Sequence, residues 1–444
     1  MTRVDLLITN ASQLVTCGAS FSLPADFSPP TAASPPLSTP SKRGAAMADP
    51  GIIADGAVAI RDGLIVAAGP TADLVERFEA ARTIDAQGRA VCPGFVDAHT
   101  HVVYSGDRIE EWTLKLSGTP YLNILAAGGG ILSTVRSVRA ASVDQLVEES
   151  LPRLKAMLRL GTTTAEVKTG YALNTEGELN MLRAIEKLDA AQLIDLVPTF
   201  LGAHTVPPEF AGRTEAYVDS VIDDQIPAAA EWYKASSFAA RGTPFFIDVF
   251  CEQNAFSLDQ SRRILSAGRA LGMRVKAHVD QFNHLGAAGL AISLDSASID
   301  HLDVTPQDEI RQAAASRTVC VVIPAVNFHL GSAHFADARA MIDDGAAVAL
   351  ATDINPGSAP CPSMPLVMAI ACRYQKLTPA EALCAATINA AAATAVDHLT
   401  GSIEPGKLAD LLILNHPDYR HAMYQFGDNP VHTVIKRGEV YPNA

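Results

Sequence analysis

Two histidines one residue apart are the part of this sequence with the clearest chemical meaning. His99 and His101 follow the apolar run 91–96, which predicts a short strand. Residues i and i+2 of a strand point to the same face, so the two imidazoles would share one side and Thr100 would point away. Neutral imidazole nitrogens suit zinc, iron and similar metals. The pair indicates half of a metal site, although two ordinary surface or core histidines can have the same spacing.

Further ligands come from the ends of other predicted strands. His278 closes the run Lys276-Ala277-His278, and Asp353 closes Leu350-Ala351-Thr352-Asp353. If the strands form a parallel barrel, their carboxyl ends meet on one face, where active sites of such barrels lie. Three imidazoles and one carboxylate would hold one metal ion and leave room for a water molecule. An ion in such a site lowers the pKa of water and polarises a carbonyl group.

The elements that must position these side chains lie between residues 90 and 395. Short apolar runs alternate there with helical patterns such as 143–160 and 178–188. The predicted strands end at His101, Lys168, His204, Glu252, His278, His301, Pro324 and Asp353. Alternation over this length predicts the α/β class and a (β/α)8 TIM-type barrel. A doubly wound open sheet is the alternative, but no G-x-G-x-x-G motif supports its dinucleotide-binding form.

Both ends of the chain have strand character instead. Alternating apolar residues at 4–16 and 57–69 resemble those at 408–414 and 431–440. We expect a small β-sandwich domain built from residues 1–90 and 396–444, around a barrel of residues 91–395. Within the first part, residues 21–50 are rich in Pro, Ser and Ala and predict a mobile surface insertion, because they offer little apolar surface to bury.

Composition limits the partners of the protein. The 444 residues are 48% hydrophobic and carry a formal net charge of −14, which argues against nucleic acid or an anionic membrane surface. The seven cysteines are scattered without a C-x-x-C pair, as expected in a reducing compartment. The first ten residues predict a strand rather than a signal peptide, and no run is long enough to span a membrane. A cytoplasmic protein with a small-molecule substrate is the expectation.

Six motifs extend the pattern. They are PGFVDAHTH (93–101), SGDR (105–108), GGGI (128–131), EVKTGY (166–171), LGAH (201–204) and DINPGS (353–358). The first is typical of the amidohydrolase superfamily, and all six together resemble the imidazolonepropionase family within it. The resemblance covers nearly the whole chain except the Pro-rich insertion. It implies a homodimer and a hydrolase of histidine degradation, in which a metal-activated water opens the ring of 4-imidazolone-5-propanoate to give N-formimino-L-glutamate.

The resemblance also implies roles for particular residues. One Zn or Fe ion would be held by His99, His101, His278 and Asp353. Arg108 would bind the substrate carboxylate, since its planar guanidinium suits a bidentate contact. Other substrate contacts would come from Tyr121, Tyr171, His204, Asn355, Gly357 and Ser358. Without the family match, Arg108 would be an ordinary surface arginine and Asn-Pro-Gly-Ser only a turn.

The route of the proton is the point at which this chain departs from part of the family. Gln281 stands where some members carry a glutamate proposed as general base, and an amide cannot titrate. Gln281 can still orient water or substrate. Asp353 and His301 then become the candidates for proton transfer, although His301 could also be a buried structural histidine. Lys168 and Glu252 are interpreted as supporting residues.

Two other interpretations stay open. The chain could be another cyclic-amide hydrolase or deaminase of the superfamily, such as a hydantoinase-like or guanine-deaminase-like enzyme, and two metal ions per chain would favour the hydantoinase side. It could also be a non-catalytic scaffold with the same barrel. The complete set of predicted ligands argues against the scaffold.

Overall fold

Parallel strands form the centre of the molecule in this computed structural model, which describes residues 1–18, 40–119 and 128–442. They pair in the order β6-β7-β8-β9-β11-β12-β13-β14, and every neighbouring pair is parallel. Their bounds are β6 (Phe95–Asp97), β7 (Thr162–Lys168), β8 (Asp195–Ala203), β9 (Phe246–Cys251), β11 (His278–Val279), β12 (Ser298–His301), β13 (Val319–Val322) and β14 (Ala347–Leu350). The short β10 (Arg274–Val275) also pairs with β9, so β10 and β11 act as one interrupted strand.

The first and last strands of this series are joined just beyond their ends. The Asp353 amide donates to the His99 carbonyl oxygen and the His101 amide donates to the Ile354 carbonyl oxygen, both at 3.0 Å. The backbone amide and hydroxyl of Thr352 both donate to the Asp97 carboxylate. These bonds close the barrel, so the predicted (β/α)8 architecture is confirmed and the open doubly wound sheet is excluded.

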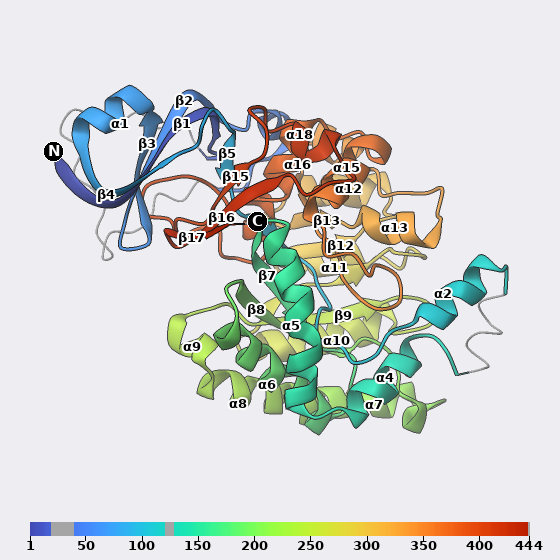
Figure 1. The fold of residues 1–444 in the computed structure, drawn as a ribbon. Coiled ribbons are helices and arrows are strands. Elements are labelled where there is room, and N and C mark those ends of the chain that lie inside the picture. Colours follow the sequence, from blue (N-terminus) through green and yellow to red (C-terminus); the bar gives the residue numbers. More distant parts are fainter. Residues whose placement is uncertain (19–39, 120–127, 443–444) are drawn as a thin grey trace.

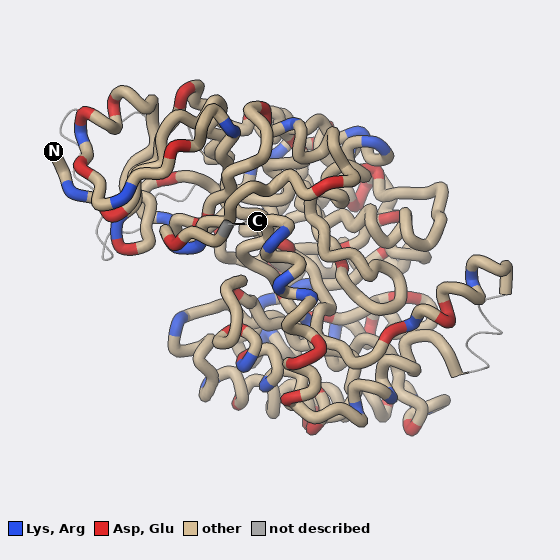
Figure 2. Tube along the Cα trace, viewed as in Figure 1, with Lys and Arg blue, Asp and Glu red and all other residues tan. Residues whose placement is uncertain are grey.

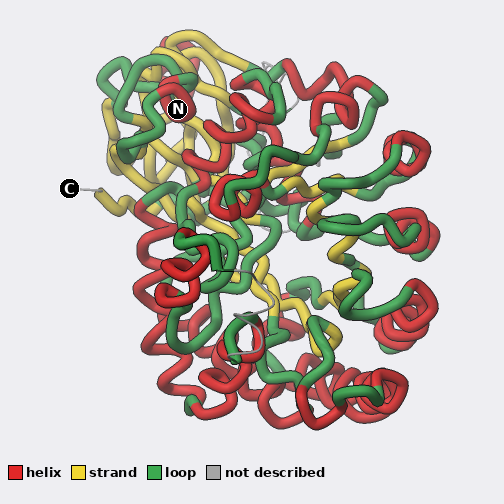
Figure 3. The backbone as a smooth tube through the Cα atoms, turned by 90° about the vertical axis from the view of Figure 1, so that its right-hand side faces the viewer, coloured by secondary structure: helices red, strands yellow, loops and turns green. Residues whose placement is uncertain are grey.

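Helices surround the strands, as Figure 3 shows from the side. Capping residues mark where two of these helices begin. The Ser142 side chain caps the helix that follows it, and Ser257 and Gln260 form a reciprocal capping box. The helices are α1 (Thr71–Arg77), α2 (Ile109–Leu116), α4 (Ile131–Ala140), α5 (Val143–Arg159), α6 (Thr175–Ala191), α7 (Thr214–Ser220), α8 (Ile226–Ala235), α9 (Ser237–Arg241), α10 (Leu258–Ala270), α11 (Ala287–Ser293), α12 (Gln307–Ala314), α13 (Pro324–Leu330), α14 (Ala338–Asp343), α15 (Met364–Tyr374), α16 (Pro379–Ala385), α17 (Ile388–Ala393) and α18 (His421–Tyr424).

A second, mixed sheet combines both ends of the chain (Figure 1). Its order is β17-β16-β15-β5-β1-β2-β3, with β4 paired to β1, and the N- and C-terminal parts meet where β15 runs antiparallel to β5. The strands are β1 (Thr2–Val15), β2 (Ile52–Arg61), β3 (Leu64–Pro70), β4 (Phe78–Asp85), β5 (Val91–Pro93), β15 (Leu411–Leu414), β16 (Val431–Lys436) and β17 (Glu439–Pro442). Alternate residues of β2 bury on opposite faces, Val58 and Ile60 in one apolar cluster and Ala57 and Ala59 in another. The predicted small β-domain from both termini is therefore present.

Residues 40–50 differ from the predicted mobile insertion. A 3-10 helix, η1 (Gly44–Ala48), buries Met47 completely. The Asn389 side chain bonds to both the amide and the carbonyl group of Lys42, and Arg43 donates to two carbonyl groups at the end of α12. These contacts fix the segment against the barrel, which its Pro- and Ser-rich composition did not indicate. Residues 19–39 lie outside the described part of the chain.

Charged residues of both signs occur along the whole described chain. Figure 2 shows lysines and arginines interspersed with aspartates and glutamates over both parts of the molecule. No helix within the described ranges combines the length and apolar character that crossing a bilayer requires.

Candidate metal centre and substrate pocket

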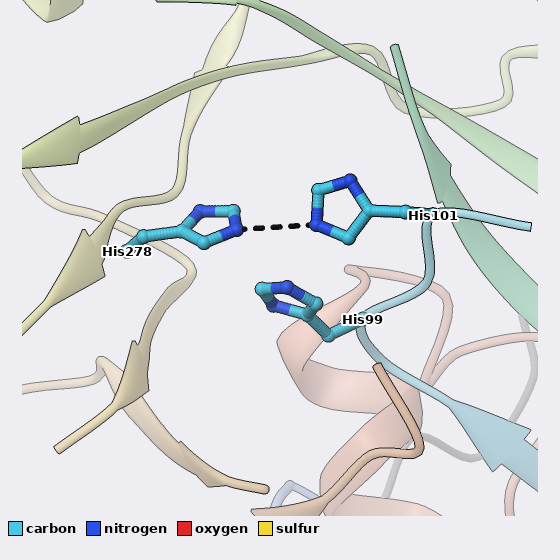
Figure 4. Close-up of side chains that lie close together, drawn as sticks. All are labelled: His99, His101 and His278. Atoms are coloured by element: carbon cyan, nitrogen blue, oxygen red, sulfur yellow. Dashed lines mark hydrogen bonds between the residues drawn. The ribbon is translucent and has the colours of Figure 1, made fainter. Parts of the chain in front are cut away.

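Three histidine rings meet at the carboxyl end of the barrel (Figure 4). His101 Nε2 lies 3.3 Å from His278 Nε2, and the ring of His99 is centred 4.4 Å from that of His278. His99 and His101 come just after β6 ends at Asp97, rather than within the strand as predicted. They still face the same point, because the closing hydrogen bonds to residues 353 and 354 fix their backbone.

Asp353 brings a carboxylate to the same point. Its Oδ1 lies 3.6 Å from Nε2 of His99 and 3.6 Å from Nε2 of His101. His301 joins from the end of β12, its ring centred 5.4 Å from that of His99. All four predicted metal ligands and one predicted proton carrier thus occupy one buried cluster.

The donor atoms of this cluster fit a metal ion. His99 Nε2 and Asp353 Oδ1 are buried and have no hydrogen-bond partner within the described residues. Burial, the largest influence, lowers the pKa of His99 and His101 well below the ordinary value, which keeps their rings neutral as metal ligands must be. Three imidazole nitrogens and one carboxylate oxygen gathered at one point can each give a lone pair to a cation. The cluster therefore has the chemistry of a mononuclear metal site.

Two buried aspartates orient the ligand rings. Asp300 Oδ2 lies 2.7 Å from Nδ1 of His99, and Asp248 Oδ1 lies 3.1 Å from Nδ1 of His278. A carboxylate only accepts, so each Nδ1 carries the proton and each Nε2 presents its lone pair to the centre. Neither aspartate was assigned a role from the sequence. The available signal was an acidic residue within an apolar strand, at Phe246-Ile247-Asp248 and Ser298-Ile299-Asp300.

Lys168 holds those aspartates in place. Its Nζ lies 2.8 Å from Asp248 Oδ2, 3.7 Å from Asp300 Oδ2 and 2.7 Å from Glu166 Oε1. Burial alone would lower the pKa of Lys168, but the carboxylates around it raise it above the ordinary value. Lys168 is therefore charged, and it is the counter-ion of Asp248 and Asp300, the aspartates that bond to the ligand histidines.

Backbone strain is concentrated at two residues of the cluster. His301 has φ +86° and Asp353 has φ +49°, a region that side chains other than glycine seldom adopt. Each such residue costs about 1–3 kcal/mol, which the surrounding structure must offset. The strained backbone turns both side chains towards the centre, where Nδ1 of His301 is also without a partner among the described residues.

A pocket of about 620 Å³ opens over the metal ligands. It is lined by His101, Arg108, Lys115, Thr119, Ile131, Tyr171, His204, Phe250, His278, Gln281, Phe282, His301, Leu330, Asp353, Asn355, Gly357 and Ser358. Every described residue predicted to bind substrate or transfer a proton is in this lining. Tyr121, the remaining predicted contact, lies outside the described residues.

Arg108 is held rigidly in the pocket wall by Glu111. Its Nε donates to Glu111 Oε2 at 2.8 Å and its Nη2 to Glu111 Oε1 at 2.5 Å. Burial alone would raise the pKa of Glu111, but the bonds from Arg108 and Lys115 lower it to about 2. The guanidinium lies against Gly357, where an added Cβ would meet Nη1 at 2.0 Å. Glu111 and Gly357 together hold Arg108 in its place in the pocket wall.

Hydrogen bonds from the Asn355 side chain hold the conformation of the loop after β14. Its Oδ1 accepts from the amides of Gly357 and Ser358, each at 2.8 Å, and its Nδ2 donates to the Asp353 carbonyl oxygen at 2.7 Å. Both ends of this amide are therefore used within the loop. Asn355 faces the pocket, and its bonds determine where Gly357 and Ser358 lie.

His204 and Tyr171 also line the pocket. His204 stacks on His101 with ring centroids 4.9 Å apart, and its Nδ1 lies 3.1 Å from the Gly170 carbonyl oxygen. A carbonyl only accepts, so Nδ1 is protonated and Nε2 is left as an acceptor. Burial lowers the pKa of His204 to about 3, so the ring is neutral. Burial, with the nearby Asp353 charge, raises the pKa of Tyr171 and keeps its phenol protonated.

Sequence comparison agrees with this class of site. Residues 90–441 match the model of the amidohydrolase family, and residues 56–78 match an imidazolonepropionase-like composite domain of bacteria. The fold and the site thus define a metal-dependent amidohydrolase. The chain is 55% identical to the imidazolonepropionase of Chloroflexus aggregans over 99% of both chains, and 46% identical to that of Herpetosiphon aurantiacus over 99% of this chain and 98% of the other. It belongs to the imidazolonepropionase family of the amidohydrolases.

Solved structures support the fold. Guanine deaminase of E. coli superposes with a TM-score of 0.67 at 17% identity, covering 98% of each chain. An adenosine deaminase from Xanthomonas campestris with bound zinc superposes with a TM-score of 0.64 at 20% identity, over 99% of this chain and 93% of the other. At these identities the likeness concerns the barrel and its small β-domain.

Proposed function

We propose that the protein opens the ring of 4-imidazolone-5-propanoate with water and releases N-formimino-L-glutamate. The observation that carries this proposal is the placement of a clamped arginine, Arg108, at the wall of a pocket whose floor is the buried His–Asp cluster. The relatives named imidazolonepropionase, at 40–55% identity over nearly the full length, support this substrate over a hydantoin or a purine.

The substrate would be held by its two polar ends. Arg108 offers Nη1 to the propanoate carboxylate, and a charge-assisted bond of this kind contributes about 1.5–3 kcal/mol. His204 and Tyr171 flank the ring on the other side, with the acceptor Nε2 of His204 available for a ring N–H. The carbonyl group of the ring would then face the metal ligands at the pocket floor.

Hydrolysis adds water to the ring carbonyl carbon, breaks the bond from that carbon to nitrogen and transfers a proton to the departing nitrogen. A metal ion held by His99, His101, His278 and Asp353 would supply Lewis acidity to the carbonyl group and to water. We assign Asp353 the role of accepting the water proton, and His301 that of passing this proton on to the departing nitrogen. Gln281, at the rim, can donate and accept hydrogen bonds but carries no titratable group, so its role is to orient water or substrate.

We further propose that the ion is zinc or iron, since three imidazoles and a carboxylate suit both. The seven free cysteines favour the cytoplasm, and the net charge of −14 is unfavourable for nucleic acid. A homodimer is supported by an apolar hollow of about 990 Å³ between α13, α15 and α18, whose rim exposes Phe328 at 55%, Tyr424 at 79% and Phe426 at 69%. Light scattering of the purified protein at two ionic strengths tests the dimer.

The decisive experiment measures loss of imidazolonepropionate absorbance with purified protein, together with its metal content. We expect turnover of this substrate, about one metal ion per chain at the His–Asp cluster, and no turnover of hydantoin or guanine. Absence of turnover in protein that contains its metal would refute the assignment.

A further inference from the structure

A second cluster of potential metal ligands includes two residues of the loop that carries Gln281. Asp280 and His284 belong to the segment between β11 and α11, and Glu309 lies in the first turn of α12. One donor atom from each of the three side chains lies within 4.8 Å of the other two. None of the three lines the substrate pocket.

The donor atoms face a common point. His284 Nδ1 lies 3.4 Å from Asp280 Oδ1 and 4.0 Å from Glu309 Oε2. The other oxygen of Asp280, Oδ2, accepts from the Thr305 hydroxyl at 2.8 Å, which holds the carboxylate in this orientation. The side chain of Glu309 is nine-tenths buried, and its Oε2 has no hydrogen-bond partner within the described part of the chain. A cation between the three side chains would give this buried carboxylate oxygen the close partner that it lacks among the described residues.

The charges lead to the same conclusion. Burial, followed by repulsion from Asp280, raises the pKa of Glu309 above its ordinary value. The ion pairs that these two carboxylates form with described residues involve only His284, whose side chain is 43% exposed. Two carboxylates beside one imidazole therefore carry an excess of negative charge, which a divalent cation would balance.

We propose that Asp280, His284 and Glu309 form a second, peripheral site for a divalent transition-metal ion such as Zn²⁺. Zinc accepts His nitrogen and Asp or Glu oxygen together, and three protein ligands leave one position for water at the exposed side of His284. Ligands from a loop and from a neighbouring helix are typical of an ion that braces structure.

The proposed ion would influence the substrate pocket through the backbone, because its ligand Asp280 is the direct neighbour of Gln281 in the pocket lining. Asp280 precedes Gln281, and the rest of this loop is held from the other side by Glu252, whose Oε2 accepts from the amides of Phe282 and Asn283 at 3.0 and 3.1 Å. An ion on Asp280 and Glu309 would tie the same loop to α12. The rim that carries Gln281 would then be anchored at both faces.

Calorimetric titration of the purified, metal-containing enzyme with ZnCl₂ tests the proposal. The parent protein should bind one more equivalent of Zn²⁺ than His284→Ala, and Glu309→Gln should weaken that equivalent at least tenfold. His284 is partly exposed and Glu309→Gln keeps the side-chain volume, so both variants should fold. The control is His398→Ala, which removes an exposed histidine outside the cluster and should leave the additional equivalent unchanged.

Hydrogen exchange of the segment 280–286 gives a second measurement. Added Zn²⁺ should slow exchange of these amides in the parent and in His398→Ala, but not in His284→Ala. Equal zinc stoichiometry and affinity in parent, His284→Ala and Glu309→Gln would overturn the proposal. Loss of the additional equivalent in His398→Ala would overturn it as well, since the binding would then be adventitious. His101→Ala should lose only the equivalent bound at the pocket floor, which separates this test from that of the catalytic metal.

Discussion

Gly357→Ala should damage substrate binding without touching the metal ligands. An added Cβ would meet Arg108 Nη1 at 2.0 Å and Cζ at 2.6 Å, whereas ordinary contacts begin at 3.4 Å. The guanidinium would have to retreat by about 1.4 Å, the difference between 3.4 and 2.0 Å, and its bonds to Glu111 oppose that movement. Gly357 itself is not in the left-handed region, so the backbone accepts alanine and the effect is steric.

The size of the effect follows from the contact that is lost. A charge-assisted hydrogen bond contributes about 1.5–3 kcal/mol, and each 1.4 kcal/mol corresponds to about tenfold. A misplacement of about 1 Å can alone cost about a hundredfold in rate. We expect kcat/KM for 4-imidazolone-5-propanoate to fall about 10- to 100-fold, with most of the change in KM, because Arg108 binds a part of the substrate remote from the reacting bond.

Steady-state kinetics with metal analysis of each variant measure this. The matched control is Gly427→Ala, a glycine whose added Cβ would meet nothing within 4 Å. In an Arg108→Ala background, Gly357→Ala should have little further effect, because the two changes remove the same contact. A Gly357→Ala enzyme with kcat/KM within twofold of the parent would refute this account of the Arg108 position.

Three further predictions concern the metal cluster and the pocket wall. His301→Asn should lose most of kcat while it keeps its metal, and near-normal kcat would exclude His301 as proton carrier. Asp248→Asn should weaken metal affinity about 10- to 100-fold in a competition with a chelator, because His278 loses the carboxylate that accepts from its Nδ1. Unchanged affinity would contradict that role. Glu111 has a folded-state pKa of about 2, below its unfolded value, so its contribution to stability is present above about pH 4.5 and is lost as the pH falls towards 2. Denaturant unfolding of Glu111→Gln and parent should therefore differ at pH 6 and converge near pH 2, and a constant difference would contradict the sign.

Local patterns were sufficient to predict most of the barrel. The apolar runs that end at Lys168 and His301 correspond to β7 and β12, which end at the same residues. Positions at strand ends also brought His278 and Asp353 to the correct face, since parallel strands in a closed barrel allow no other arrangement. The pair His99 and His101 was placed on a strand, because the sequence does not show that their backbone would pair with residues beyond β14.

Contacts across long sequence distances were not predictable in this way. Asp300 lies 201 residues from His99 in the chain, and nothing in either neighbourhood reveals the partner. Glu111 resembles any acidic residue in the first turn of a helix, a place that such residues favour for local reasons. The fixed position of residues 40–50 was not predictable for the same reason, since it depends on Asn389 and on carbonyl groups of α12 rather than on the composition of the segment.

The hydrogen bonds that close the barrel have a consequence for the order of events in biosynthesis. His99 and His101 belong to the first barrel strand segment and Asp353 to the last, and their own backbone groups make the closing bonds. A nascent chain that has not yet placed β14 has neither a joined barrel nor a complete set of ligands. Metal uptake at this point should therefore report that the barrel is closed, and an ion bound there would lock together its first and last strand segments.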